Sequence, residues 1–462
     1  MSWFSSTQVK SKDPRRRIDA IAKLEEARDQ QSMTLVMSAL GDQAVEVRLE
    51  ALRVITRWRD KNTLRALVHV LRDPHPDVRE RAILELRTAG GRESIPALVQ
   101  CLVDPVASVR AQAVPTLAYL GWTPQTPTDH VLDLIGRSQF SEAGAVGRVA
   151  LDFLLPFVGH ACISTRRDVA EALGLQRDER ATAALEKLLL DPDAGVRIAA
   201  MTSLARMKAS VTVIERMTVD VDKNVRVAAV ETLGDMKDTE AVPALLRSLE
   251  DEHWGVRCAA AAALGVIGER ASVPLLIDAL KDSDPDMRVA CAEALGLIGD
   301  VEAIEPLVLA QLDPEMRVRQ AALRAVLRVD YRWQRNPKAY RTLLTVKRAL
   351  RSDDFSVRNA ATELLERIFS IRRPSWRSGG GDGEADRRAA AEMLIVCLWD
   401  DNALLRGAAA EALGHLRARR ALELLKVKIE DPHEWVRERA AAALVQIEAT
   451  EASAGGGWRP AT

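Results

Sequence analysis

Residues Asp284–Asp300 read DPDMRVACAEALGLIGD, and a closely similar phrase stands 31 residues earlier as DEHWGVRCAAAAALGVIGE, Asp251–Glu269. A third copy, DKNVRVAAVETLGDMKD, spans Asp222–Asp238. Each copy holds one arginine that is followed by a run rich in alanine; we call it the repeat arginine, and in the first copy it is Arg288. A phrase that returns at a fixed spacing indicates a fold built from repeating units.

The repeat arginines divide the chain into units of nearly constant length. Eight of the twelve intervals between them are 31 residues, one is 29, and three are longer, at 56, 39 and 48. Such a period leaves room for two helices and a turn in every unit, which is typical of an α-helical solenoid rather than a single compact core. The repeat arginines are Arg17, Arg48, Arg79, Arg110, Arg166, Arg197, Arg226, Arg257, Arg288, Arg319, Arg358, Arg406 and Arg437.

One unit shows how the helix pair is encoded. Gly296 lies inside the first expected helix, where a missing side chain lets a neighbouring helix approach, and Gly299 lies where a left-handed cap would end that helix. Pro274 falls in the first turn of a second helix, where proline costs no hydrogen bond. The first helix has one apolar stripe, made of Met287, Cys291, Ala294, Leu295 and Ile298.

An aspartate precedes most repeat arginines by six residues. Such an aspartate ends one helix and opens the turn into the next. The regular spacing of acid and base predicts a ladder of bonds between successive units. The aspartates are Asp42, Asp73, Asp104, Asp191, Asp220, Asp251, Asp282, Asp313, Asp400 and Asp431.

These features resemble the HEAT-repeat family, in the short form known as phycobilisome-lyase-like HEAT repeats, over roughly residues 13–448. The resemblance implies an all-α fold, a right-handed α-α superhelical solenoid of about 13–14 helix pairs, one of them degenerate near Arg148. No unit can bury its own apolar stripe, so the array is expected to fold by stacking neighbours.

The irregular intervals suggest a division of the chain. We expect an N-terminal extension (1–12), regular repeats (13–120), an irregular insertion or degenerate repeat (121–165), regular repeats (166–330), repeats with basic loop insertions at 331–341 and 370–388 (331–448), and a flexible tail (449–462).

Composition predicts a cytoplasmic protein. Lys and Arg number 65 against 66 Asp and Glu, so the net charge is −1, and the five cysteines form no close pair, as in a reducing compartment. The first residues hold no apolar run of a signal peptide, and the longest apolar stretch, Leu151–Ile163, is too short to span a membrane.

Local charge is less even. Between Arg317 and Arg351 the chain holds eleven Lys or Arg and one acid, Asp330. Three successive inter-helix loops, at Asp330–Arg341, Ser370–Arg388 and His415–Glu423, are rich in arginine and aromatics. One interpretation is a basic aromatic edge that binds a protein partner with an acidic surface. The other interpretation is that the arginines are merely solvated and the tryptophans pin their loops. The candidate residues are Tyr331, Arg332, Trp333, Arg335, Arg341, Arg372, Arg373, Trp376, Arg377, Arg417, Arg419 and Arg420.

Patterns for catalysis, cofactors or metals are weak. The glycine cluster Ser378–Gly383 lacks the lysine and the strand of a phosphate loop, so it suggests a flexible link. One HEAT family, the deoxyhypusine hydroxylases, holds two irons with repeated His-Glu pairs; here only His433-Glu434 has this form, and one pair cannot build that site. We therefore expect no catalytic, cofactor or metal residues.

The sequence thus favours a non-enzymatic protein-interaction scaffold, such as an assembly factor or chaperone. It would hold its partner by the inner helix face and the basic aromatic edge. Two alternatives stay open: nucleic-acid binding through the same edge, and an enzyme, either metal-dependent or a bilin lyase as the repeat type allows by resemblance.

Overall fold

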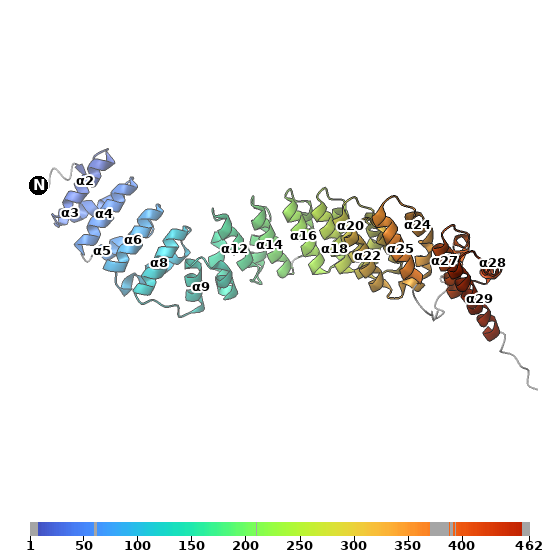
Figure 1. The fold of residues 1–462 in the computed structure, drawn as a ribbon. Helices are drawn as coiled ribbons and strands as arrows, with labels where there is room; N and C mark the ends of the chain where they lie inside the picture. The colour runs from blue at the N-terminus through green and yellow to red at the C-terminus, as the bar shows by residue number, and fades with distance from the viewer. Residues whose placement is uncertain are drawn as a thin grey trace, which may run out of the picture. The chain divides into compact units, whose positions relative to one another are not determined.

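The chain folds into helix pairs throughout the part that the structure describes. This computed structural model describes residues 8–59, 62–208, 210–369, 388, 391–392 and 394–454, and among these residues it has helices and no strand. The helices form two compact units, which we call the N-terminal unit (Met1–Ser210) and the C-terminal unit (Val211–Thr462). The predicted all-α solenoid of helix pairs is confirmed in both (Figure 1).

In the N-terminal unit each repeat arginine lies in the first helix of a pair. The first helices are α2 (Pro14–Leu24), α4 (Val45–Trp58), α6 (Pro76–Ala89), α8 (Ala107–Tyr119), α12 (Ile163–Leu173) and α14 (Ala194–Arg206). The second helices are α3 (Gln30–Ala39), α5 (Thr63–Val70), α7 (Ile95–Gln100), α9 (Pro127–Gly136) and α13 (Glu179–Leu188).

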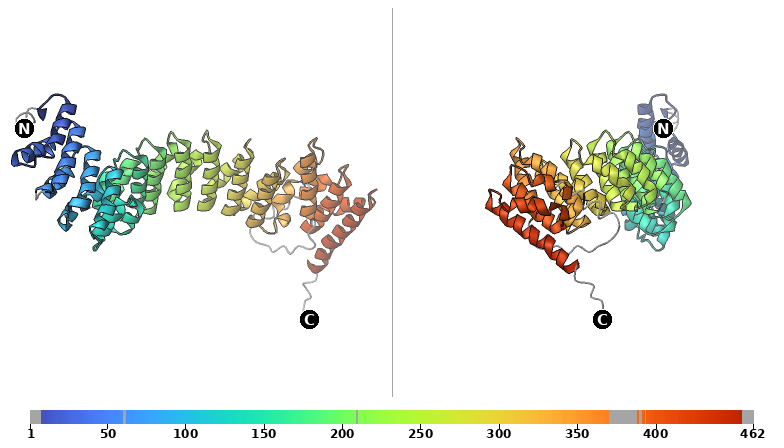
Figure 2. Two further views of the ribbon diagram at one scale, coloured as in Figure 1. Left: turned by 60° about the vertical axis from the view of Figure 1, so that its left-hand side comes forward. Right: turned by 90° about the vertical axis from the view of Figure 1, so that its right-hand side faces the viewer.

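The C-terminal unit follows the same plan, and its first helices lie side by side in Figures 1 and 2. They are α16 (Lys223–Met236), α18 (Trp254–Ile267), α20 (Pro285–Ile298), α22 (Met316–Val329), α25 (Phe355–Phe369), α27 (Ala403–Leu416) and α29 (Glu434–Ala454). The other helices include α15 (Val211–Glu215), α17 (Val242–Ser248), α19 (Val273–Ala279), α21 (Ile304–Leu309), α23 (Pro337–Arg341), α24 (Leu343–Ala349) and α28 (Leu422–Lys428).

Glycines allow adjacent first helices to touch. A Cβ atom added to Gly296 would lie 2.7 Å from the Cα atom of Ala325 on the next first helix. Gly265 meets Ala294 in the same way, so the close approach predicted for Gly296 is confirmed and repeats along the unit. Gly299 ends its helix with φ 72°, as expected of a left-handed cap.

The predicted ladder of arginine and aspartate is also confirmed. Arg79 donates from Nε and Nη2 to the two carboxylate oxygens of Asp104 in the next repeat, at 2.8 and 2.7 Å. Its Nη1 donates to the carbonyl oxygen of Asp73 in its own repeat at 2.8 Å. The same pairing joins Arg17–Asp42, Arg48–Asp73, Arg166–Asp191, Arg226–Asp251, Arg288–Asp313 and Arg406–Asp431. Arg257 and Asp282 form a longer ion pair, with Nε 3.6 Å from a carboxylate oxygen.

The ladder changes at the irregular segment that follows Arg110. This arginine is fully buried and its Nη2 donates to the Ser138 hydroxyl at 2.9 Å instead of a carboxylate. Its guanidinium lies 5.5 and 5.3 Å from the ring centroids of Phe140 and Phe157. The short helix α10 (Phe140–Ala145) takes the place of a first helix and packs on α12. The segment is therefore a shortened helix pair built around aromatic rings.

Candidate partner-binding surfaces

The predicted basic aromatic edge is only partly a surface. Tyr331 is exposed, and the Arg332 guanidinium lies 4.8 Å from the centre of its ring. Trp333, in contrast, is fully buried, so the prediction that its side chain contacts a partner is wrong. The chain after α22 folds back into a 3-10 turn and α23, which places this indole in the core. Its role matches the alternative interpretation, in which the tryptophan pins the segment.

The basic run between Arg317 and Arg351 is largely neutralised by carboxylates of other repeats. Arg324 pairs with Glu293 at 3.1 Å, and Lys338 pairs with Glu302 at 2.6 Å. Further pairs join Arg317 to Asp286, Arg341 to Glu305, Lys347 to Asp400 and Arg351 to Asp401. Much of the local excess of positive charge is therefore used inside the C-terminal unit, because acids and bases face each other between repeats.

The remaining described candidates lie in one turn, which joins α27 to α28. Arg417 and Arg420 lie exposed in the turn between α27 and α28, and Arg420 pairs with Glu392 at 3.3 Å. Arg419 is exposed in the same turn. Four candidates lie outside the described residues, as does the side chain of a fifth: Arg372, Arg373, Trp376, Arg377 and, for its side chain, Arg335.

A different surface row follows the starts of the first helices in the C-terminal unit. Trp254, Met316 and Phe355 are 51%, 63% and 74% exposed, and each lies three residues before a repeat arginine. Pro285 has the same place in the repeat between the first two and is half-buried. We call these four residues the apolar edge.

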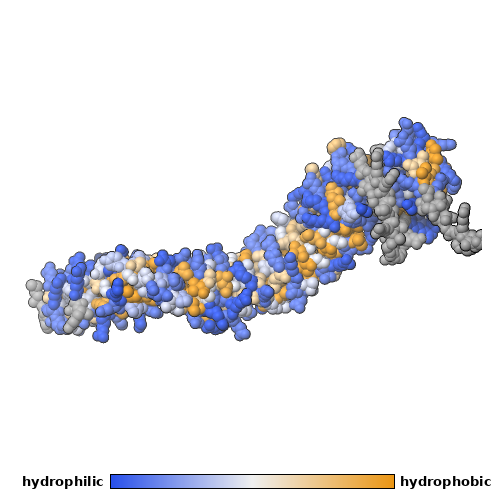
Figure 3. All heavy atoms as spheres, turned by 90° about the horizontal axis from the view of Figure 1, so that it is seen from below, coloured by the Kyte–Doolittle hydropathy of each residue, from blue (hydrophilic) through white to orange (hydrophobic). Residues whose placement is uncertain are grey.

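The apolar edge follows the starts of successive first helices, and the ring of Trp254 is held by its neighbour. Helix α20 packs between α18 and α22, and the Ser356 hydroxyl donates to the Pro314 carbonyl oxygen at 3.1 Å, which joins the turns before α22 and α25. The His253 ring stacks on Trp254 with centroids 5.9 Å apart. The sequence contains a signal for this row, because a large apolar residue recurs three positions before the repeat arginine. On the face drawn in Figure 3, hydrophobic side chains reach the surface in patches bordered by hydrophilic ones.

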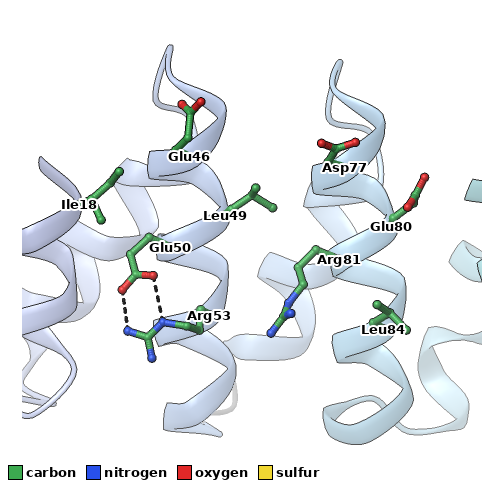
Figure 4. Close-up of a pocket in the computed structure, with 9 residues that line it drawn as sticks. All are labelled: Ile18, Glu46, Leu49, Glu50, Arg53, Asp77, Glu80, Arg81 and Leu84. Atoms are coloured by element: carbon green, nitrogen blue, oxygen red, sulfur yellow. Dashed lines mark hydrogen bonds and ion pairs between the residues drawn. The ribbon is translucent and has the colours of Figure 1, made fainter. Parts of the chain in front are cut away.

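The N-terminal unit has a groove across α2, α4 and α6, with a volume of about 470 Å³ (Figure 4). Leu49 of α4 and Leu84 of α6 supply its apolar part, and Arg81 extends from α6 toward α4. Five pairs of lining residues are 31 apart in the sequence, so the groove is made by the repeat itself. The lining consists of Ile18, Glu46, Leu49, Glu50, Arg53, Asp77, Glu80, Arg81 and Leu84.

Outside these surfaces, the pKa shifts of a ladder aspartate and of two cysteines have local physical causes. The Arg166 guanidinium holds the pKa of Asp191 below its ordinary value against the opposing effect of burial, so this rung stays ionised at neutral pH. All five cysteines are free. The exposed Cys162 has a pKa lowered to about 7 by a hydrogen bond with the Ser164 hydroxyl and by the backbone of Thr165. Burial raises the pKa of Cys101 to about 12.

The described residues contain neither a cluster of metal ligands nor a membrane-spanning helix. In that part of the chain, His, Cys, Asp and Glu form no group of three or more placed to hold a metal ion. His433 lies exposed just before α29, where its backbone N–H donates to Asp431 at 3.1 Å. None of the helices described is both long and apolar enough to cross a membrane.

Several solved structures are similar to this chain at low identity and with low TM-scores. Kap95p, in a structure with RanGDP, is 12% identical, with 98% of this chain and 67% of that chain covered and a TM-score of 0.40. Importin beta is 15% identical over 98% and 68% of the two chains, with a TM-score of 0.37. Human deoxyhypusine hydroxylase is 19% identical over 67% and 98%, with a TM-score of 0.25. No curated protein matches the sequence.

The family model of HEAT repeats matches five stretches that together span well over half of the sequence: residues 33–118, 151–215, 210–280, 256–327 and 383–454. These stretches contain most of the repeat arginines and of the ladder that they form. The chain therefore belongs to the HEAT-repeat family.

Proposed function

We propose that this protein is a non-enzymatic interaction scaffold that holds a protein partner along the apolar edge. The observation that carries the proposal is the exposure of Trp254, Met316 and Phe355 at one register of neighbouring repeats. Large apolar side chains exposed in a row mark surfaces that another protein covers, and aromatic residues contribute most at such contacts. The five free cysteines fit a reducing compartment such as the cytoplasm.

The edge predicted from the sequence becomes a secondary part of this proposal. Its exposed described members follow the ends of α22 and α27, so they would add a contact at the opposite ends of the first helices. They are Tyr331, Arg332, Arg417, Arg419 and Arg420. Nucleic-acid binding has less support, because the arginines and lysines that would face phosphates are paired with Glu293, Glu302 and other carboxylates.

The test compares two triple variants of the full chain in its native host. One carries Trp254→Ser, Met316→Ser and Phe355→Ser. The control carries Val396→Ser, Val427→Ser and Val445→Ser, which are equally exposed in the same unit but lie off the apolar edge. Quantitative affinity purification should recover a stoichiometric protein with the wild type and the control, and at least tenfold less with the edge variant. Equal recovery with both variants would refute the proposal.

A further inference from the structure

The groove of the N-terminal unit has the features of a peptide site. Its volume of about 470 Å³ is in the range of natural binding pockets. Leu49 and Leu84 come from neighbouring first helices, and Figure 4 shows both side chains beside the gap between α4 and α6. Such an apolar surface can seat one large aliphatic or aromatic side chain. The packed helices hold it in place, so binding would require little ordering of the protein.

The charges around this apolar surface are unbalanced. Glu50 is neutralised by Arg53, whose Nη2 lies 2.5 Å from it, and Arg81 is neutralised by Glu85 outside the groove. Glu46 and Glu80 form no ion pair with any described residue. The groove therefore presents spare negative charge above an apolar floor.

The carboxylate of Asp77 adds to this charge. Its nearest basic group is the His75 ring, with Nδ1 at 3.9 Å. That nitrogen accepts the backbone N–H of Asp77 at 3.3 Å, so the ring is bonded to the backbone of Asp77 rather than to its carboxylate. Three carboxylates from two adjacent repeats, on Glu46, Asp77 and Glu80, are thus available to a ligand.

We propose that this groove binds a basic segment of a protein partner, in which Lys or Arg residues flank one large apolar side chain. The apolar side chain rests on Leu49 and Leu84, and the cationic groups pair with Glu46, Asp77 and Glu80. The negative charge of the groove disfavours polyanions such as nucleic acids. Its apolar floor favours a peptide over a simple cation. The inference rests on the proposed scaffold function and adds a second contact to it, in the other unit.

The experiment starts from a display library of random twelve-residue peptides and selects those that bind the full chain. Peptides that also bind a Glu46→Lys, Glu80→Lys variant are removed. We expect the selected peptides to share at least two Lys or Arg around a Leu, Met, Phe or Trp. Their affinity, measured by fluorescence polarisation, should fall at least tenfold on the double variant and also when the apolar residue of the peptide is changed to Ala.

A matched control makes the same change in charge elsewhere in the unit, through Glu179→Lys and Glu186→Lys on α13, which are exposed and outside the groove. Binding to this control should stay within twofold of the wild type. The proposal is overturned if no peptide is enriched, if the shared pattern is neutral or acidic, or if both variants weaken binding equally. Circular dichroism of the variants shows whether they are folded. Loss of this site would leave the result for the apolar edge unchanged, so the two proposals fail separately.

Discussion

At the scale of single residues, the ladder puts a buried guanidinium between two repeats. Arg79 and Asp104 each have side chains only 9% exposed, and two hydrogen bonds join them. Arg110 is buried as deeply, yet it faces a hydroxyl and two aromatic rings. Burial lowers the pKa of Arg110, because no carboxylate bonds to it. The two positions therefore hold the same side chain by different interactions.

This contrast predicts unequal effects of the same substitution. Arg79→Met leaves the Asp104 carboxylate buried without its partner, and the loss of one member of such a pair costs about 3–5 kcal/mol. Arg110→Met leaves no buried carboxylate without a partner, and it places a thioether against the two aromatic rings. We therefore expect the free energy of unfolding to fall by about 1–2 kcal/mol. Hydrogen exchange of α6 and α8, followed by mass spectrometry, measures both. Equal losses of stability in the two variants would show that leaving Asp104 buried without its partner adds no cost.

The same residues show what the sequence can predict. Each ion pair of the ladder joins residues that are 25 apart in the sequence, such as Arg79 and Asp104. Because this separation follows from the repeat period, the ladder can be predicted from the sequence alone. Trp333 and Lys338 lie in a segment that breaks the period, and their burial and pairing depend on how that segment folds back. The number of arginines in a segment does not show which carboxylates pair with them. The basic run therefore predicted more unpaired positive charge than the structure presents.

At the scale of helices, spacing depends on glycines at one register. Gly234, Gly265 and Gly296 each lie eight residues after a repeat arginine, and each touches an alanine of the next first helix. An added methyl group at Gly265 would lie 2.7 Å from the Ala294 Cα atom, which belongs to the backbone and cannot move alone. The helix pair would have to separate.

We expect Gly265→Ala to destabilise the repeat although alanine is the better helix former. Alanine gains about 1 kcal/mol of helix propensity over glycine, but overpacking costs about 1–3 kcal/mol and separation of the helices adds lost contacts. Gly255→Ala in the same helix is the control, because its Cβ atom would meet side chains rather than backbone: the His253 ring at 3.1 Å and a methyl group of Val227 at 3.9 Å. Thermal unfolding followed by circular dichroism should show a lower midpoint for the first variant alone. A higher midpoint for Gly265→Ala would mean that the helices yield easily.

At the scale of the whole molecule, the contacts of the ladder and of the glycines link successive repeats. Arg288 bonds to Asp313, and Gly296 touches Ala325 one repeat away. The stability of such an array is close to a sum of repeat terms and neighbour terms, so unfolding need not include the whole chain at once. The groove and the apolar edge lie in different units and should respond to different substitutions.

The last prediction follows from this. In urea below the main transition, Gly265→Ala should speed amide exchange in α16, α18, α20 and α22 and leave α2, α4, α6 and α8 as in the wild type. The reason is that the strain at Gly265 falls on Ala294 and on the repeats stacked beside it, and its effect weakens with each repeat. Hydrogen exchange followed by mass spectrometry resolves these helices in one experiment, with Gly255→Ala as the control. Faster exchange in every helix would mean that the 462 residues unfold as one cooperative body, and the neighbour-by-neighbour account would be wrong.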